Sequence, residues 1–248
     1  KSSTVNGGTA LGSGSLTIGV LASNGCALRI ESNSVVGGVG QVPTSSAGVV
    51  CTSNDVNGAA GANSACEVVS NRSIQGGPGT AASTGLYCGG NCAAGVASCP
   101  GSCAEVRLNP SILAGTAPTQ LHGIIENSSP KVERNQFGVG PNGATGCGAG
   151  NTNSVTALRL WGSSSQVVNN YVVTGACANT LALDLVAHRR SGDNSVPSPD
   201  LHSNTFVAGE VSSAGSPVTT VAASLGGDGT VIAKASVGTF RNNIFTVR

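Results

Sequence analysis

The segment from Asp184 to His202 is the richest in ionisable side chains in this 248-residue chain. Carboxylates and imidazoles that converge on one site act as general acid and base, and polysaccharide hydrolysis uses two carboxylates. If the chain has a catalytic or glycan-binding site, we expect it in this segment, with the candidate residues Asp184, His188, Arg189, Asp193, Asp200 and His202. The alternative is a solvated loop with local ion pairs.

Nine cysteines form the second chemically distinctive group. Cys51 and Cys88 follow equivalent apolar segments, and Cys66 and Cys103 precede the equivalent next ones. The predicted disulfides are Cys51 with Cys66, Cys88 with Cys103, Cys92 with Cys99, and Cys147 with Cys177. This pairing leaves Cys26 without a partner in the chain. We therefore expect it to be a free buried thiol or to form a disulfide with another chain. Disulfides persist in oxidising compartments, so we predict an extracellular or cell-surface location.

Zinc binding is the alternative role for some of these cysteines, because Cys88-x3-Cys92 and Cys99-x3-Cys103 supply four thiolates as ligands. Disulfides are favoured because no histidine lies near these cysteines and because Cys51 with Cys66 repeats the outer pair without the inner one. We therefore predict neither a metal nor another cofactor.

The chain contains an internal repeat, in which a hydrophobic residue is followed three positions later by asparagine. The seven asparagines are Asn33, Asn71, Asn109, Asn135, Asn170, Asn204 and Asn243, at intervals of 26 to 39 residues. Such a period is typical of stacked equivalent units. A β-sandwich is the alternative, but it gives no reason for asparagine at a constant offset.

The clearest copy of the repeat, residues 157 to 175, indicates three short strands separated by Ser-, Gly- and Asn-containing breaks. Three strands per turn allow the chain to coil and to pair with itself in parallel. Asparagine tolerates left-handed backbone, so we place it at a bend, where stacked amides bond to one another in a ladder.

We therefore predict an all-β, parallel β-helix solenoid of about seven turns, with loop insertions and disulfides. Residues 1 to 15 are predicted to be an N-terminal extension or a first partial turn, and residues 16 to 248 a single domain.

In this repeat, the residues at outward positions of neighbouring strands come together. Arg159 and Asp184 each lie between two inward leucines, so we expect them to form a surface ion pair worth under about 1 kcal/mol. That makes them a poor catalytic pair. Trp161, the only tryptophan, is positioned to stack on a sugar if it points outward.

The seven repeat units, together with the stretch Gly-Ile-Ile-Glu-Asn-Ser-Ser-Pro-Lys-Val-Glu-Arg-Asn at 123 to 135, resemble the right-handed parallel β-helix family. This is the pectin-lyase-like, or carbohydrate-binding and sugar-hydrolase, repeat group. The resemblance spans residues 16 to 248. It implies the fold but no one function, because the family includes lyases, hydrolases, epimerases, phage tailspikes, adhesins and surface fibres.

Composition narrows the range of partners. Charged residues make up 9% of the chain and the net charge is +1, so there is no basic stripe for nucleic acid. The chain has no run of eighteen apolar residues, so the sequence predicts no membrane-spanning segment.

The leading functional prediction is a secreted or cell-surface structural protein that stacks head to tail with copies of itself into a fibre. We expect both ends of the repeat to be without a polar cap, and open solenoid ends favour such contacts. The alternative is a polysaccharide-active enzyme or glycan-binding module of the lyase or hydrolase type, and a third reading is an adhesin or phage spike fragment. Because the acids are scattered, we lean against an enzyme.

Overall fold

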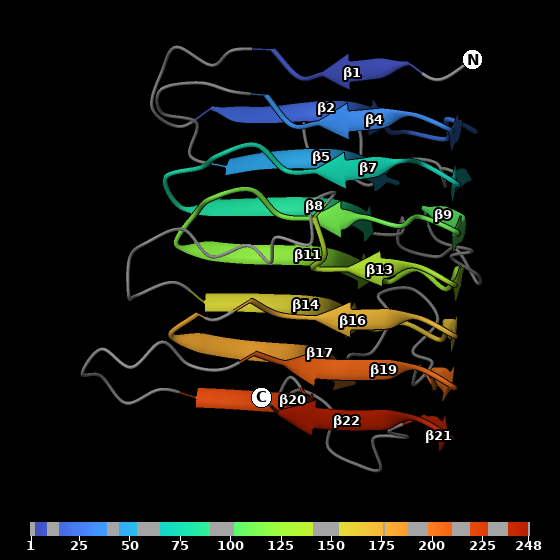
Figure 1. Cartoon of the computed structure of the whole chain (residues 1–248). Helices are drawn as coiled ribbons and strands as arrows, with labels where there is room; N and C mark the ends of the chain where they lie inside the picture. Colours follow the sequence, from blue (N-terminus) through green and yellow to red (C-terminus); the bar gives the residue numbers. More distant parts are fainter. Residues whose placement is uncertain are drawn as a thin grey trace.

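The computed structural model describes residues 3–8, 15–38, 45–53, 65–89, 102–140, 154–175, 177–187, 198–209, 219–227 and 238–247. These residues form 22 β-strands arranged in three parallel sheets (Figure 1). They form no helix long and apolar enough to cross a membrane.

Sheet B contains the long first strand of each turn. Its seven strands, in spatial order, are β2 (Leu16–Ala22), β5 (Ser45–Thr52), β8 (Ala82–Gly89), β11 (Thr119–Glu126), β14 (Ser154–Trp161), β17 (Asn179–Ala187) and β20 (Thr219–Gly227).

Sheet C contains the short second strands. Their order is β3 (Arg29–Glu31), β6 (Cys66–Val69), β9 (Cys103–Arg107), β12 (Lys131–Glu133), β15 (Gln166–Val168), β18 (Asp200–His202) and β21 (Thr239–Arg241). Each strand contains the hydrophobic residue of one copy of the repeat.

Sheet A contains the third strands and one additional strand at the N-terminal end. Its order is β1 (Thr4–Asn6), β4 (Ser34–Val36), β7 (Ser73–Gln75), β10 (Ile112–Leu113), β13 (Gln136–Phe137), β16 (Tyr171–Val173), β19 (Thr205–Ala208) and β22 (Ile244–Val247). Each strand pairs in parallel with the strand three places further along the chain, which confirms the predicted all-β parallel solenoid.

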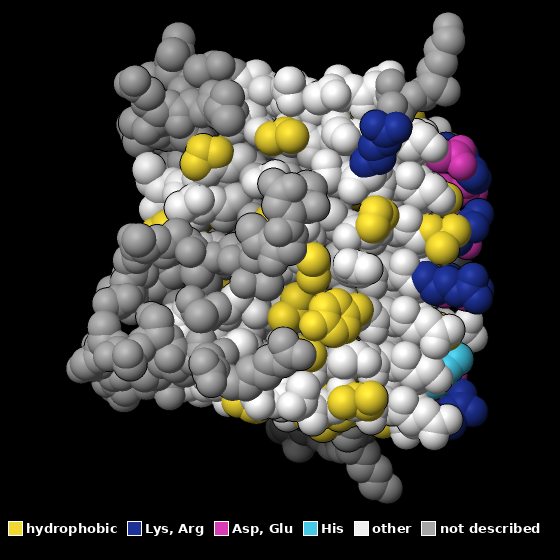
Figure 2. All heavy atoms as spheres, in the orientation of Figure 1, with side chains coloured by type: hydrophobic (Ala, Val, Ile, Leu, Met, Phe, Trp, Pro, Cys, Tyr) yellow, Lys and Arg dark blue, Asp and Glu magenta, His cyan; other side chains and the backbone are white. Residues whose placement is uncertain are grey.

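The inward side chains of the three sheets form columns of apolar residues along the coil axis. In sheet A, one such column is fully buried and consists of Val35, Ile74, Ile112, Phe137, Val172 and Phe206. The outer faces differ in composition, and charged side chains gather over sheet C, on the right in Figure 2. The core therefore positions three outward-facing surfaces on one rigid frame.

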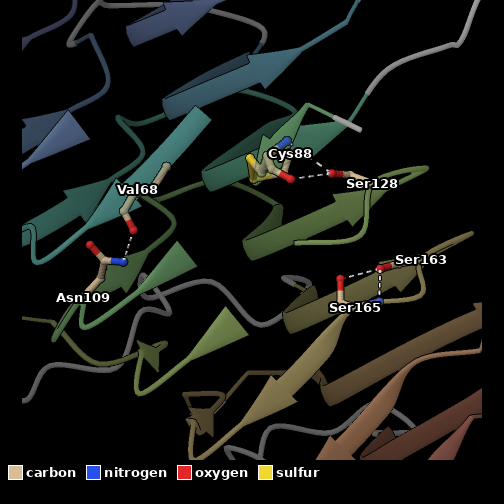
Figure 3. Close-up of a disulfide and its surroundings, with 7 residues drawn as sticks. Val68, Cys88, Asn109, Ser128, Ser163 and Ser165 are labelled. Carbon is tan, nitrogen blue, oxygen red and sulfur yellow. Dashed lines mark hydrogen bonds between the residues drawn. A yellow bond between two sulfur atoms is a disulfide. The ribbon is translucent and has the colours of Figure 1, made fainter. Parts of the chain in front are cut away.

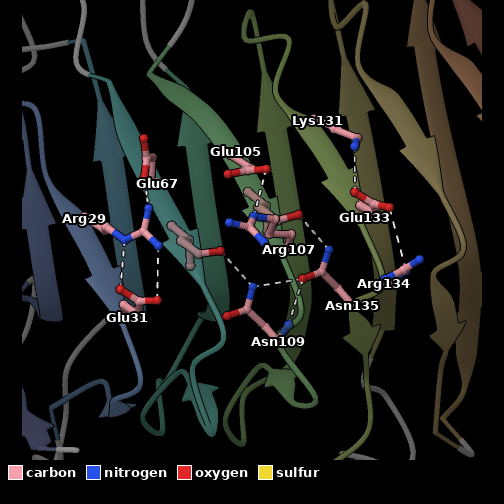
Figure 4. A network of polar contacts seen from close by, with 12 residues as sticks. Arg29, Glu31, Glu67, Glu105, Arg107, Asn109, Lys131, Glu133, Arg134 and Asn135 are labelled. Atoms are coloured by element: carbon pink, nitrogen blue, oxygen red, sulfur yellow. Dashed lines mark hydrogen bonds and ion pairs between the residues drawn. The ribbon is translucent and has the colours of Figure 1, made fainter. Parts of the chain in front are cut away.

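The seven repeat asparagines lie in one continuous hydrogen-bonded column. At its centre, Asn135 Oδ1 accepts hydrogen bonds from the main-chain N–H of Asn109 (3.1 Å) and from its Nδ2 (2.8 Å). The Nδ2 group of Asn135 donates to the carbonyl oxygen of Val106 in the preceding turn (2.9 Å). Figure 4 shows these contacts, and Figure 3 shows the equivalent bond from Asn109 to Val68. Each amide therefore satisfies main-chain groups that the turn leaves outside the sheets.

The left-handed residue at each bend is the one before the asparagine, and not the asparagine itself as predicted. Positive φ angles occur at Ser32, Ser70, Leu108, Arg134, Asn169, Ser203 and Asn242. Leu108 and Arg134 adopt this conformation although a left-handed L-residue costs about 1 kcal/mol. The buried asparagine stabilises the bend through its side-chain hydrogen bonds, so backbone tolerance is not the reason for its presence.

The fourth turn has a different core from its neighbours. His122 is fully buried opposite Gly85 of β8, and its Nδ1 accepts a hydrogen bond from the main-chain N–H of Ala114 (3.0 Å). The next residue is Gly123, at a position where the neighbouring strands have leucine. A Cβ atom on Gly123 would lie 2.5 Å from the ring of Phe137. The phenylalanine ring therefore fills the volume that leucine fills elsewhere.

Replacing Asn135 by alanine is expected to lower the free energy of unfolding by about 3 kcal/mol, because it leaves the buried Asn109 N–H and Val106 carbonyl unsatisfied. Urea unfolding measures this loss. Asn33→Ala is the matched control, expected to cost under about 1 kcal/mol, because the Asn33 amide donates only to Glu31 of its own turn. Equal losses in the two variants would contradict this role for the column.

His122 predicts a pH-dependent stability. Burial lowers its pKa from 6.5 to about 3, so the folded chain keeps it neutral where the unfolded chain protonates it. As the pH falls from 6.5 toward 3, stability decreases by about 1.4 kcal/mol per pH unit from this group. His122→Asn retains an acceptor for Ala114 and should flatten the profile of urea unfolding measured from pH 4 to 8. Parallel profiles for the two proteins would refute the assignment.

Candidate functional site

The predicted site residues lie on two different sheets. Asp184 is in the middle of β17 in sheet B, whereas Asp200 and His202 are in β18 of sheet C. Asp184 pairs with Arg159, and Asp200 pairs with Arg241 (2.8 Å). His188, Arg189 and Asp193 lie outside the described residues. The structure therefore does not join Asp184 to Asp200 and His202 in one cluster.

Arg159 and Asp184 form the predicted ion pair on the outer face of sheet B. They are register partners in β14 and β17, and Arg159 Nε lies 2.8 Å from Asp184 Oδ2. The arginine side chain is 32% exposed and the aspartate side chain 12% exposed. The pair therefore presents a partly desolvated, fixed guanidinium on this face.

A groove of about 640 Å³ runs across β14, β17 and β20 on the same face. Its polar lining includes Ser154, Thr156, Arg159, Asn179 and Ser224. A smaller hollow of about 340 Å³ is lined by Arg159, Trp161, Asp184 and Val186. Because Arg159 lines both, the groove and the hollow adjoin, and together they combine hydroxyl, amide, guanidinium and indole groups.

The other carboxylate that the described strands of this face carry is already engaged. Glu126 of β11 accepts a hydrogen bond from the hydroxyl of Tyr87 in β8 (3.0 Å). Burial and this carboxylate raise the pKa of Tyr87 well above its ordinary value, so the phenol remains a donor. The strand β14 separates Glu126 from Asp184. Among the described residues, the groove thus has no pair of carboxylates converging on a common point, as glycoside hydrolysis requires.

The outer face of sheet C carries a charged strip. Its charged residues and its histidine are Arg29, Glu31, Glu67, Glu105, Arg107, Lys131, Glu133, Asp200, His202 and Arg241. Figure 4 shows several of its ion pairs, including Arg107–Glu105 (2.8 Å) and Lys131–Glu133 (2.7 Å). The Lys131 ammonium lowers the pKa of Glu133. Because acids and bases neutralise one another here, this strip does not produce a strong field of one sign.

The charged strip was missed in the sequence because its members come from strands that are far apart along the chain. Only the parallel register brings Arg29 beside Glu67 and Lys131 beside Glu105. The detectable signal was a charged residue one position before or after the repeat hydrophobic residue. Sequence reasoning also did not single out His122, which lies in a segment of ordinary strand pattern.

The cysteines agree only in part with the predicted pairing. Cys88 and Cys103 form the predicted disulfide (Figure 3), which excludes them as zinc ligands. Cys51 and Cys66 are adjacent buried thiols instead of a disulfide. Cys51 and Cys66 are the register partners of Cys88 and Cys103, and a β-bulge follows Cys103 in β9.

Cys26 is a free thiol but is exposed, which corrects its predicted burial. It lies between β2 and β3 in the first turn, outside the apolar columns. Cys177 is disulfide-bonded. Its predicted partner Cys147 lies outside the described residues, as do Cys92 and Cys99. Among the described residues, no three acids, histidines or cysteines are grouped for metal binding.

No protein-family model matches this chain, and neither a curated protein nor a solved structure shows significant similarity to it.

Proposed function

We propose that the chain is a glycan-binding module of an extracellular β-solenoid protein, with its site on the outer face of sheet B. The observation that carries this proposal is the groove across β14, β17 and β20, which adjoins the hollow of Trp161 at Arg159. The resemblance of the repeat to the pectin-lyase-like, carbohydrate-binding group supports the same assignment.

The lining of the groove suits a sugar polymer. Hydroxyl and amide side chains such as Thr156 and Asn179 exchange hydrogen bonds with sugar hydroxyls. The Trp161 indole offers an apolar face for stacking against a sugar ring. The Arg159 guanidinium donates to hydroxyl or carboxylate oxygens while Asp184 fixes its orientation. An open groove across parallel strands accommodates an extended chain better than a small enclosed molecule.

Binding is favoured over cleavage because the two acids in the described strands of this face have other partners. Asp184 is bonded to Arg159, and Glu126 is bonded to Tyr87. The disulfides at Cys88–Cys103 and at Cys177 support an extracellular location, since such bonds are rare in reducing compartments.

Affinity electrophoresis on a panel of neutral and acidic polysaccharides tests the groove. At least one polysaccharide is expected to retard the wild-type chain, and Trp161→Ala to weaken that binding at least tenfold, equivalent to about 1.4 kcal/mol. Tyr171→Ala on sheet A is the matched aromatic control and should bind as the wild type does. Loss of retardation by the control alone, or no retardation by any polysaccharide, would remove the support for this site.

A second candidate function is a fibre in which copies stack head to tail. Large exposed hydrophobic side chains favour it, because six of the seven in the described residues lie in the first or last turn. They are Leu16, Leu21, Leu225, Ile244, Phe245 and Val247; the seventh is Leu108.

The asparagine column gives the two ends opposite hydrogen-bonding polarity, which favours a second copy as the occupant. In every turn the main-chain N–H donates to Oδ1 of the next asparagine, and from Asn71 onward Nδ2 does so as well, as Asn204 donates to Asn243 (both 3.0 Å). Continuing this pattern, Asn243 of one copy would donate to Asn33 of the next. Sheet A, however, has one more strand than the other sheets. Strand β1 therefore occupies the place that β22 of the other copy would take.

Deleting residues 1 to 8 should accordingly promote assembly, because it frees the edge of β4. Light scattering and electron microscopy are expected to show longer particles for the deletion variant than for the full chain. Adding Leu225→Asp should abolish them, since a charge would enter the stacked core. Leu108→Asp places the same charge on the side of the coil and is the control. A monodisperse deletion variant at high concentration would exclude stacking of this kind.

A further inference from the structure

The Cys51 and Cys66 thiols lie in register with the Cys88–Cys103 disulfide of the next turn. Cys51 is the parallel register partner of Cys88, and Cys66 is that of Cys103. Both pairs are separated by 15 residues in the sequence. The Cα atoms of Cys88 and Cys103 are 5.6 Å apart, within the range that disulfides require. Because Cys51 and Cys66 each pair in register with a member of that disulfide, they are positioned for an equivalent bond, with a β-bulge at Ala104 as the local difference between the two turns.

The two thiols already interact with each other. Their side chains are hydrogen-bonded, and both residues are fully buried. The hydrogen bond from Cys51 lowers the pKa of Cys66, whereas the same bond and burial raise the pKa of Cys51. Cys66 is therefore the first of the pair to ionise and the better nucleophile. Burial, however, keeps both thiols away from an oxidant in solution.

An exposed thiol lies beside this buried pair. Cys26 is exposed, and its carbonyl oxygen accepts a hydrogen bond from the main-chain N–H of Ala65, the residue before Cys66 (3.3 Å). On the other side, Ala22 at the end of β2 is the register partner of Cys51. Cys26, which follows β2 by four residues, is thus held in the turn adjoining both thiols.

We propose that Cys26, Cys51 and Cys66 form a thiol–disulfide exchange site that takes small disulfides as its substrate. Exposed Cys26 reacts first, and a disulfide between Cys51 and Cys66 is the product.

The exchange conserves atoms and electrons in three steps. The Cys26 thiolate attacks a small disulfide, forming a mixed disulfide and releasing one thiol. The Cys66 thiolate then attacks the Cys26 sulfur and releases the second small thiol, which leaves a bond between Cys26 and Cys66. Cys51 loses its proton and attacks the Cys66 sulfur, and the departing Cys26 thiolate takes up a proton. The dithiol is oxidised by two electrons and the small disulfide is reduced to two thiols.

The test starts from the full chain with Cys26, Cys51 and Cys66 as thiols and adds oxidised glutathione. Samples are quenched with acid, alkylated after denaturation and mapped by mass spectrometry without reduction. We expect a transient glutathione adduct on Cys26, followed by a peptide linking Cys51 to Cys66 with Cys26 free. If Cys51 and Cys66 both remain alkylatable at the end, the exchange site is refuted.

Two variants separate the route from the product. In Cys51→Ala with Cys66→Ala, the glutathione adduct on Cys26 should persist, since neither of the two neighbouring thiols remains to displace it. Alanine is tolerated at the position of Cys51 in the neighbouring turn, where Ala22 occupies it. In Cys26→Ser, formation of the Cys51–Cys66 bond should slow at least tenfold. A wild-type rate in Cys26→Ser would overturn the role of Cys26.

Discussion

The hydrogen bond between successive asparagine side chains is the interaction on which the coil depends. Main-chain pairing joins the turns within each sheet, but the sharp bend between sheets C and A would leave buried groups unpaired. The asparagine amide satisfies them, and at Leu108 and Arg134 it maintains a left-handed backbone that these residues disfavour. With the bend held in this way, the apolar columns stay in register, and so do the outward residues of every turn.

The sequence was sufficient to predict the fold because the repeat identifies equivalent positions. It placed a hydrophobic residue in every strand of sheet C and led to Arg159 facing Asp184. It did not reveal which residue of the bend is left-handed, since periodicity reports equivalence and not the sign of φ. Periodicity also did not reveal that His122 and the Phe137 ring fill the core around Gly123, because this packing involves two sheets.

The candidate sites were harder to predict, because they arise from the register between distant turns. The groove combines residues of β14, β17 and β20, and the charged strip combines residues of all but one strand of sheet C. The predicted cluster from Asp184 to His202 followed proximity in sequence, yet the chain turns from sheet B to sheet C within it. Matching positions across turns was the better guide, as the cysteines of β5, β6, β8 and β9 illustrate.

The fourth turn has a consequence for how such a chain changes over generations. Duplicating or deleting an ordinary turn preserves the columns, because one leucine or valine replaces another. Here the Phe137 ring, which comes from a different sheet, fills the space that a side chain at position 123 would occupy, and His122 lies beside Gly123. These three residues must be inherited as a block. Recombination between this turn and any other would produce either a cavity or a clash, so the coil lengthens more readily on either side of it than through it.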